Sequence, residues 1–366
     1  MRVSLLRYPL FIVVILMMFA GGWAALQRAG WRLPILSPTL IGMHGPLMIG
    51  GVFGALIALE RAVAISSLLR SPRHWSFLAP ALAGIGGLLL VLGGAPLVAK
   101  LCLVSSSLLL VGVYSFTATK HHYWSLHTAI MCLGAVMWLV GNVFWTAGYP
   151  VYIVVHAWMA FIVLTIVGER LELSRVTRLT RRTEHLLTGA VAIYAIGVLL
   201  TLFDLAGGLR VAGVGAVLVA LWLMRYDIAG KRLRHPGLTG YVASCLFTGY
   251  IWLGISGILA VSFGAVYAGF QYDAVIHAVV GGFVFSMVFG HAPMIFPALT
   301  GRQIAYMNAF YFPLVILHAS IVLREISNLN GSFEGRMWAG MINAVAILLF
   351  LGMMAYGAVR HARQQG

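Results

Sequence analysis

"MHGPLMIGGVFGALIALERAVA", residues 43–64, is an apolar run with His44 near one end and the pair Glu60 and Arg61 near the other. About 20 consecutive apolar residues are enough for a helix to cross the hydrocarbon core of a bilayer. The stretch therefore predicts a membrane-spanning helix. The polar residues at its two ends either form a functional site or only anchor the helix in the membrane.

Similar runs fill the rest of the chain. Of its 366 residues 61% are hydrophobic and only 9% are charged, which excludes a soluble globule because its surface could not be covered by polar groups. The composition predicts an all-α polytopic membrane protein with about 12 transmembrane helices in one membrane domain, 1–366. The predicted spans are 8–28, 39–65, 76–96, 98–119, 124–147, 151–173, 185–204, 210–228, 238–263, 270–299, 303–327 and 335–360.

The charge distribution predicts how the chain is oriented. A net charge of +15 would suggest nucleic acid as a partner of a soluble protein, but here basic residues concentrate in alternate loops, such as 169–182 and 225–234. The loops at 147–152 and 264–273 carry no Lys or Arg. Cytoplasmic loops are enriched in Lys and Arg, so we expect a bacterial-type cytoplasmic (inner) membrane, both termini in the cytoplasm, lipid as a partner and no nucleic acid.

Four histidines fall at nearly one predicted depth. His44, His156 and His277 lie about five to seven residues after the outer ends of the second, sixth and tenth spans, which is roughly 8–10 Å below the outer surface. His318, on the eleventh span, reaches almost the same layer from the other direction. Ionisable side chains in a membrane normally face a partner, a cavity or a cofactor, and neutral imidazole is a good ligand of haem and copper.

We therefore predict that these histidines bind cofactors. His44 and His277 are the expected ligands of haem b, of which the chain could hold one or two. His156 and His318 are expected to form a second metal position for haem or copper. The alternative is that each histidine only forms a hydrogen bond to a neighbouring helix.

A second pair of histidines lies toward the inner side. His291 follows His277 by 14 residues, which in an α-helix places both toward the same side. Pro293 and Pro297 come directly after it and are expected to bend the helix. With His127 on the fifth span, His291 is predicted to form an inner accessory site.

The acidic residues receive weaker functional predictions. In an α-helix Glu60 would lie about 160° from His44, and Glu169 about 140° from His156, so the acids do not share the histidine faces. Their Arg neighbours favour helix anchoring, with proton entry as the alternative. Asp273, one turn before His277, is expected to orient that imidazole or to handle a proton, unless it only caps the helix.

The intervals between the histidines suggest an internal repeat. Of the three at one depth, His44 and His156 are 112 residues apart, and His156 and His277 are 121 apart. This spacing predicts a threefold arrangement of four-helix units near 1–119, 120–230 and 231–366.

The layout resembles the main subunit of the haem-copper oxidases and nitric oxide reductases. In that superfamily the second and tenth helices supply haem ligands and the sixth a copper ligand, which implies haem at His44 and His277 and copper or a second haem at His156. The seventh span departs from this pattern, because it has only His185 and lacks paired histidines, and the tenth lacks an H-x-H arrangement. These departures argue against a four-electron oxygen reductase.

A closer resemblance is to the NnrS-type proteins, which are polytopic membrane proteins associated with haem, copper and nitric oxide stress. It is carried by "HAVVGGFVFSMVFGHAPMIFPALTGR", residues 277–302. It implies a redox protein, an oxidoreductase if it is an enzyme, that handles nitric oxide or oxygen or passes electrons to cytochrome c or another redox subunit. The alternatives are a transporter of metal ions or small solutes, and a structural subunit of a respiratory complex.

Overall fold

The chain folds into helices joined by short turns and loops. The computed structural model describes residues 6–71, 74–120, 124–174 and 179–365, and these contain no strand. Within these residues, 12 helical segments are long and apolar enough to cross a membrane. The predicted all-α polytopic membrane fold is thereby confirmed, and the protein contacts membrane lipid. Part of the predicted basic loop, 175–178, lies outside the described residues.

The helices form two compact units. Unit 1 comprises Met1–Glu169 with Ala298–Thr300, and unit 2 comprises Arg170–Pro297 with Gly301–Gly366. The boundary after Glu169 falls within the sixth predicted span, close to its end. The threefold repeat stays a prediction.

Unit 1 contains the first six spans. Its helical elements are α1 (Arg7–Ala29), α2 (His44–Pro46), the π-helix η1 (Leu47–Gly54), α3 (Ala55–Leu68), the 3-10 helix η2 (Trp75–Phe77), α4 (Leu78–Leu92), α5 (Pro96–Lys120), α6 (Leu126–Thr146) and α7 (Val151–Leu173), which runs past the unit boundary.

Unit 2 contains the other six spans. Its helical elements are α8 (Arg181–Leu200), α9 (Leu205–Tyr226), α10 (Ile228–Arg232), α11 (Gly237–Phe263), α12 (Gly269–His277), the π-helix η4 (Ala278–Val284), α13 (Phe285–Thr300, whose last residues belong to unit 1), the 3-10 helix η5 (Asn308–Phe310), α14 (Tyr311–Leu329) and α15 (Phe333–Gln365).

Side chains at the helix starts set several of these boundaries. The side chains of Ser125, Thr180 and Asp204 accept backbone N–H groups in the first turns of α6, α8 and α9. At the other end, α1 stops at Gly30 and α4 at Gly93, both in the left-handed conformation that glycine adopts at low cost. The second span starts at His44 rather than at residue 39, because 39–43 form turns.

Two spans contain a π-helical segment, and each segment comes just after a candidate ligand. In unit 1, η1 begins three residues after His44, and in unit 2, η4 begins directly after His277. π-helical turns are rare and often mark functional sites. Each segment also contains a Gly-Gly pair.

Close contacts between small residues pack the helices of unit 1. A Cβ atom on Gly51 would lie only 3.2 Å from the Cα atom of Gly87, so η1 and α4 touch backbone to backbone. Ser106 on α5 donates a hydrogen bond of 2.7 Å to the carbonyl of Ala79 on α4. Small residues and interhelical hydrogen bonds are the usual means by which helices associate in lipid, where the hydrophobic effect does not drive them together.

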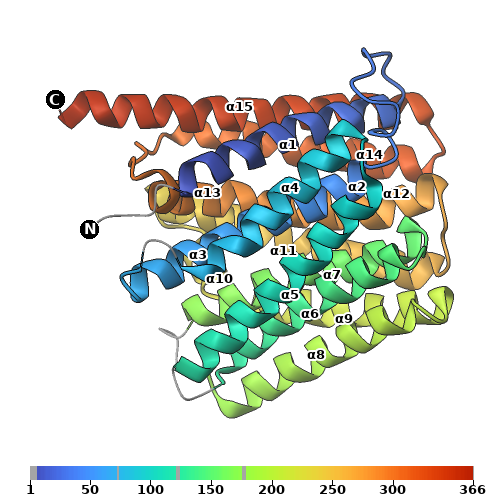
Figure 1. Cartoon of the computed structure of the whole chain (residues 1–366), viewed down its shortest axis with the longest axis horizontal. Coiled ribbons are helices and arrows are strands. Elements are labelled where there is room, and N and C mark those ends of the chain that lie inside the picture. The colour runs from blue at the N-terminus through green and yellow to red at the C-terminus, as the bar shows by residue number, and fades with distance from the viewer. Residues whose placement is uncertain (1–5, 72–73, 121–123, 175–178, 366) are drawn as a thin grey trace. The chain divides into compact units, whose positions relative to one another are not determined.

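Unit 2 is packed in the same way. In Figure 1, α8 and α9 run side by side, and Gly197 on α8 lies against the backbone of Ala212 on α9. The opposite side of α9 meets α11, where a Cβ atom on Gly213 would lie 2.6 Å from the carbonyl oxygen of Gly257. Helices α14 and α15 form a further antiparallel pair.

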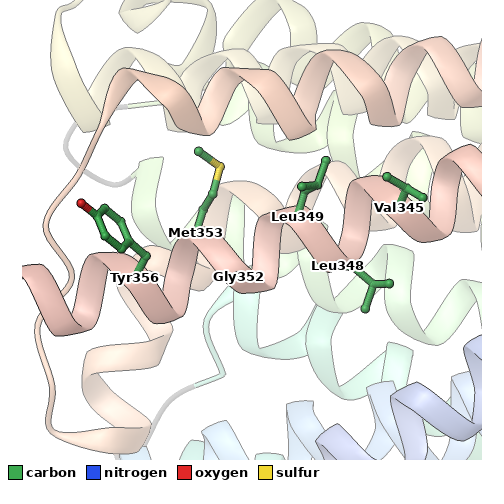
Figure 2. Close-up of a pocket in the computed structure, with 6 residues that line it drawn as sticks. All are labelled: Val345, Leu348, Leu349, Gly352, Met353 and Tyr356. Atoms are coloured by element: carbon green, nitrogen blue, oxygen red, sulfur yellow. The ribbon is translucent and has the colours of Figure 1, made fainter.

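Large apolar side chains remain exposed on the outside of the spans, as expected for helices that face lipid. On α15 they line a shallow pocket of about 390 Å³, and all of its lining residues come from this one helix (Figure 2). They are Val345, Leu348, Leu349, Gly352, Met353 and Tyr356. Because no polar group converges on the pocket, it is a lipid-facing groove and not the candidate site.

Candidate functional site

His156 is the most deeply buried of the candidate ligands in unit 1. It lies on α7, and the residue is 3% exposed. Its ring forms a hydrogen bond with the backbone of Tyr152, one turn earlier, whereas its Nε2 atom is buried and has no hydrogen-bond partner. A backbone carbonyl only accepts, so Nδ1 carries the proton and Nε2 keeps its lone pair. This is the arrangement of a histidine that binds a metal through Nε2.

A hydrogen-bond network fixes α7 close to His156. Trp158, two residues further on, donates from Nε1 to Oδ1 of Asn142 on α6 over 3.0 Å. Asn142 in turn donates from Nδ2 to the carbonyl of Leu103 at 3.1 Å and to Oγ of Ser107 at 3.2 Å, both on α5. Asn142 is 1% exposed, so the network joins three helices in the interior of unit 1.

His44 begins the second span of the same unit. Its Nδ1 atom lies 2.9 Å from the carbonyl oxygen of Gly21 on α1, so Nδ1 is again the protonated nitrogen. The next residue, Gly45, approaches the side chain of Val151, because a Cβ atom on Gly45 would lie 3.9 Å from Cγ1 of Val151. Val151 lies five residues before His156 on α7. The start of the second span therefore packs beside the start of the sixth.

His277 lies in an ionic cluster of unit 2. Its Nδ1 atom is 3.0 Å from the backbone oxygen of Asp273 and 3.2 Å from its carboxylate Oδ1. Nη2 of Arg324, on α14, lies 3.4 Å from His277 Nε2. Asp273 lies inside α12 and not at its cap, which is Ala268, and its contact with the imidazole leaves orientation of His277 or proton handling as predictions.

Three other histidines form hydrogen bonds within their own units, and the ring of His291, like that of His156, is bonded to the backbone one turn earlier. His291 is 9% exposed, and its Nδ1 atom lies 2.8 Å from the carbonyl of Met287, one turn earlier. His318 accepts a hydrogen bond at Nδ1 from Trp252 Nε1, which places its proton on Nε2. His127 pairs through Nε2 with the hydroxyl of Ser125.

The two units divide the predicted ligand sets. His44, His127 and His156 belong to unit 1, whereas His277, His291 and His318 belong to unit 2. The pairings of His44 with His277, His156 with His318 and His127 with His291 stay predictions. Within the part of the chain that the structure describes, no three His, Cys, Asp or Glu side chains form a group that could hold a metal ion.

Two of the angular predictions, for His44 with Glu60 and for His277 with His291, rest on an uninterrupted α-helix that the structure does not have. They assumed 3.6 residues per turn between His44 and Glu60 and between His277 and His291. Each of these intervals contains a π-helical segment, in which hydrogen bonds run from residue i to i+5 and the turn is wider. The faces derived from the sequence therefore do not apply to either pair.

The acids at the other ends of the spans form ion pairs. Glu169 on α7 accepts a hydrogen bond of 2.5 Å from Arg61 on α3, and Glu60 lies 3.5 Å from the same guanidinium. The charge cluster thus joins the ends of two helices of unit 1, and both anchoring and proton entry stay predictions for these acids. The sequence indicated the local pair, but not the contact between residues 61 and 169.

The small residues near the ligands are packing contacts. A Cβ atom on Gly141 would collide with the indole of Trp158, and one on Gly281 would lie 2.5 Å from the side chain of Ile321. Ala160, four residues after His156, is fully buried. The buried Nε2 atom of His156 is the kind of donor atom that a metal or a haem iron would need.

Several polar residues were not predicted from the sequence. They are Asn142 and the group of Arg324, Glu325 and Asn328 on α14. The signal was present, because two adjacent charged residues stand within an otherwise apolar span at 303–327.

A family model matches residues 7–359, which is almost the whole chain. The chain belongs to the family described as a domain of unknown function (DUF8744). No curated protein and no solved structure matches it. The DUF8744 match includes both π-helical segments and every histidine discussed above.

Proposed function

We propose that the protein is a haem-binding redox protein of the membrane, with His156 as an axial ligand of haem b. The observation that carries the proposal is the buried Nε2 atom of His156, which keeps its lone pair and has no partner. An unsatisfied buried polar atom costs about 1–3 kcal/mol, and coordination of an iron would remove this cost.

His44 is the second ligand that we propose. It belongs to the same unit as His156, its Nδ1 proton is likewise held by a carbonyl, and the π-helix η1 follows it. The packing of Gly45 against Val151 supports the pairing, since it brings together the two helix starts that carry the ligands.

The other residues of unit 1 orient and shield these ligands. The backbone of Tyr152 holds the His156 ring, and the Trp158–Asn142 hydrogen bond fixes the rotation of α7. The apolar surroundings exclude water. A haem held by His156 and His44 would supply one-electron transfer or the binding of nitric oxide or oxygen.

We place this chemistry in the bacterial-type cytoplasmic membrane, with both termini in the cytoplasm, because of the basic loops at 169–182 and 225–234. The ligands then lie toward the outer surface, within reach of an external electron partner such as a cytochrome c or another redox subunit.

The test is the visible spectrum of the full chain, purified from haem-sufficient cells in the oxidised and the dithionite-reduced state. We expect a Soret band and a sharp α-band in the reduced state. His156→Ala and His44→Ala should lose or shift these bands. The matched control is His318→Ala, another membrane histidine, because the contact with Trp252 leaves its Nε2 protonated.

A colourless wild-type protein that also fails to take up added haemin would refute the proposal. An unchanged spectrum in His156→Ala would refute the assignment of the ligand. Loss of colour in His277→Ala, with both unit 1 variants unaffected, would instead favour a haem ligand in unit 2.

A further inference from the structure

The last turn of α14 carries a second polar group, which the proposed haem site does not use. Arg324, Glu325 and Asn328 lie here, next to Asp273 on α12. All of them belong to unit 2. Within membrane-spanning segments, ionisable side chains are rare and usually functional.

One carboxylate of this group is fully paired. Asp273 accepts two hydrogen bonds from Arg324, of 2.7 and 2.8 Å, in a bidentate arrangement. It accepts a third from Nδ2 of Asn328, of 2.9 Å. The charge of the Asp273 carboxylate is therefore compensated by the Arg324 guanidinium.

The other carboxylate has no donor. Glu325 is 7% exposed, and neither Oε1 nor Oε2 has a hydrogen-bond partner. Asn328 is 5% exposed, and its Oδ1 atom also lacks a partner. Residues three apart on a helix are neighbours on its surface, so three buried acceptor oxygens without a donor belong to neighbouring side chains.

The three charged side chains of this group sum to one uncompensated negative charge. Asp273 and Glu325 contribute two negative charges and Arg324 one positive charge, and Asp273 and Arg324 are near enough to act on Glu325 electrostatically. An unpaired ionised carboxylate in an apolar interior is so costly that such a group neutralises instead. A single proton would supply both the missing charge and the missing donor.

We propose that Glu325 binds a proton and, as a neutral carboxylic acid, donates it to Oδ1 of Asn328, which makes this end of α14 a proton-binding site. Its occupant is a proton rather than a metal ion, since one added hydrogen satisfies both side chains, whereas a metal ion needs several converging oxygens. Loss of the proton creates a second anion beside Arg324, which then competes with Asp273 for the guanidinium.

The other elements packed on α14 provide few charged groups that could compensate the charge of an ionised Glu325. On α12 they are Asp273 and His277, whose imidazole lies between Asp273 and Arg324. On α15 they are Glu334 and Arg336 at this end, and Arg336 lies over the ring of Phe270 at 4.5 Å. The segments η4 and η5 have no ionisable side chain.

Infrared spectroscopy of the full chain in lipid vesicles tests the proposal. A protonated carboxylic acid has a carbonyl stretch separate from that of a carboxylate, and with only nine Asp and Glu residues a single acid is resolved in a difference spectrum. We expect this band at neutral pH in the wild type. It should be absent from Glu325→Gln and present in Glu334→Gln, whose replaced side chain is exposed.

Stability gives a second measurement. Raising the pH should destabilise the wild type as Glu325 ionises without a partner, and should not produce this loss in Glu325→Gln, whose amide can still donate to Asn328. Asn328→Ala should keep the acid band but shift it, because the acceptor of the O–H group is gone.

Three results would overturn the proposal. One is a spectrum with no protonated acid in the wild type at neutral pH, and another is an acid band that persists in Glu325→Gln. The third is wild-type stability that rises with sodium chloride but not with choline chloride at constant pH, because this would identify a metal cation as the occupant. None of these measurements depends on haem.

Discussion

Replacing Asn142 by alanine is expected to destabilise unit 1 by about 2 kcal/mol. The side chain is 1% exposed and makes three hydrogen bonds, two to α5 and one to Trp158 on α7. Hydrogen bonds between membrane helices contribute on average about 0.6 kcal/mol each, which for three bonds leads to the expected loss. The freed N–H of Trp158 would also remain without an acceptor.

Two single-bond variants calibrate this magnitude. Ser107→Ala removes one acceptor of Asn142, and Trp158→Phe removes one donor while an aromatic ring is kept. Each should cost about 0.6 kcal/mol. In a double-mutant cycle, Trp158→Phe should cost less in the Asn142→Ala background than in the wild type, because the bond between the two residues is already lost.

The assay is unfolding of the purified full chain in mixed micelles with increasing sodium dodecyl sulfate, followed by circular dichroism. The reasoning is refuted if the Asn142→Ala variant is no less stable than the Ser107→Ala variant. It is also refuted if the losses of stability caused by Asn142→Ala and Trp158→Phe add strictly in the double mutant. The same preparations also test the haem proposal, because a less firmly packed α7 should weaken the binding of haem by His156.

Two further predictions concern Asp227, which pairs with Arg170, and His74, which caps η2. Asp227→Asn should destabilise unit 2 by about 3–5 kcal/mol in the same assay, because Arg170, only 3% exposed, loses its bidentate partner; a loss no larger than that of Glu334→Gln would contradict this. Burial lowers the pKa of His74, which caps η2 by accepting the N–H of Ser76, below its ordinary value of 6.5. The folded state therefore binds fewer protons than the unfolded state, so stability should fall as the pH drops through this value, and His74→Asn, which still caps but does not titrate, should show a smaller dependence.

The membrane fold follows from local properties of the chain. Each span is an apolar run long enough to satisfy its own backbone hydrogen bonds within lipid, so the 12 spans could be recognised one by one. Boundaries shifted by a few residues where turns and caps decide them, as at His44.

The hydrogen-bond and ion-pair partners of the polar side chains could not be predicted from the sequence. The bonds of Asn142 to Trp158, of Arg61 to Glu169 and of Arg324 to Asp273 join residues that are 16, 108 and 51 positions apart. Which side chains meet depends on how each helix is rotated against its neighbours, and the apolar pattern of a membrane span does not specify that rotation.

By itself the sequence determined that the protein is a helical membrane protein, since hydropathy and the length of an apolar run act within one segment. Only the tertiary structure decided which nitrogen of His44, His156 and His318 carries the proton, that π-helical turns follow His44 and His277, and that Glu325 is buried without a donor. These properties arise where backbone carbonyls and side chains of different turns and helices meet.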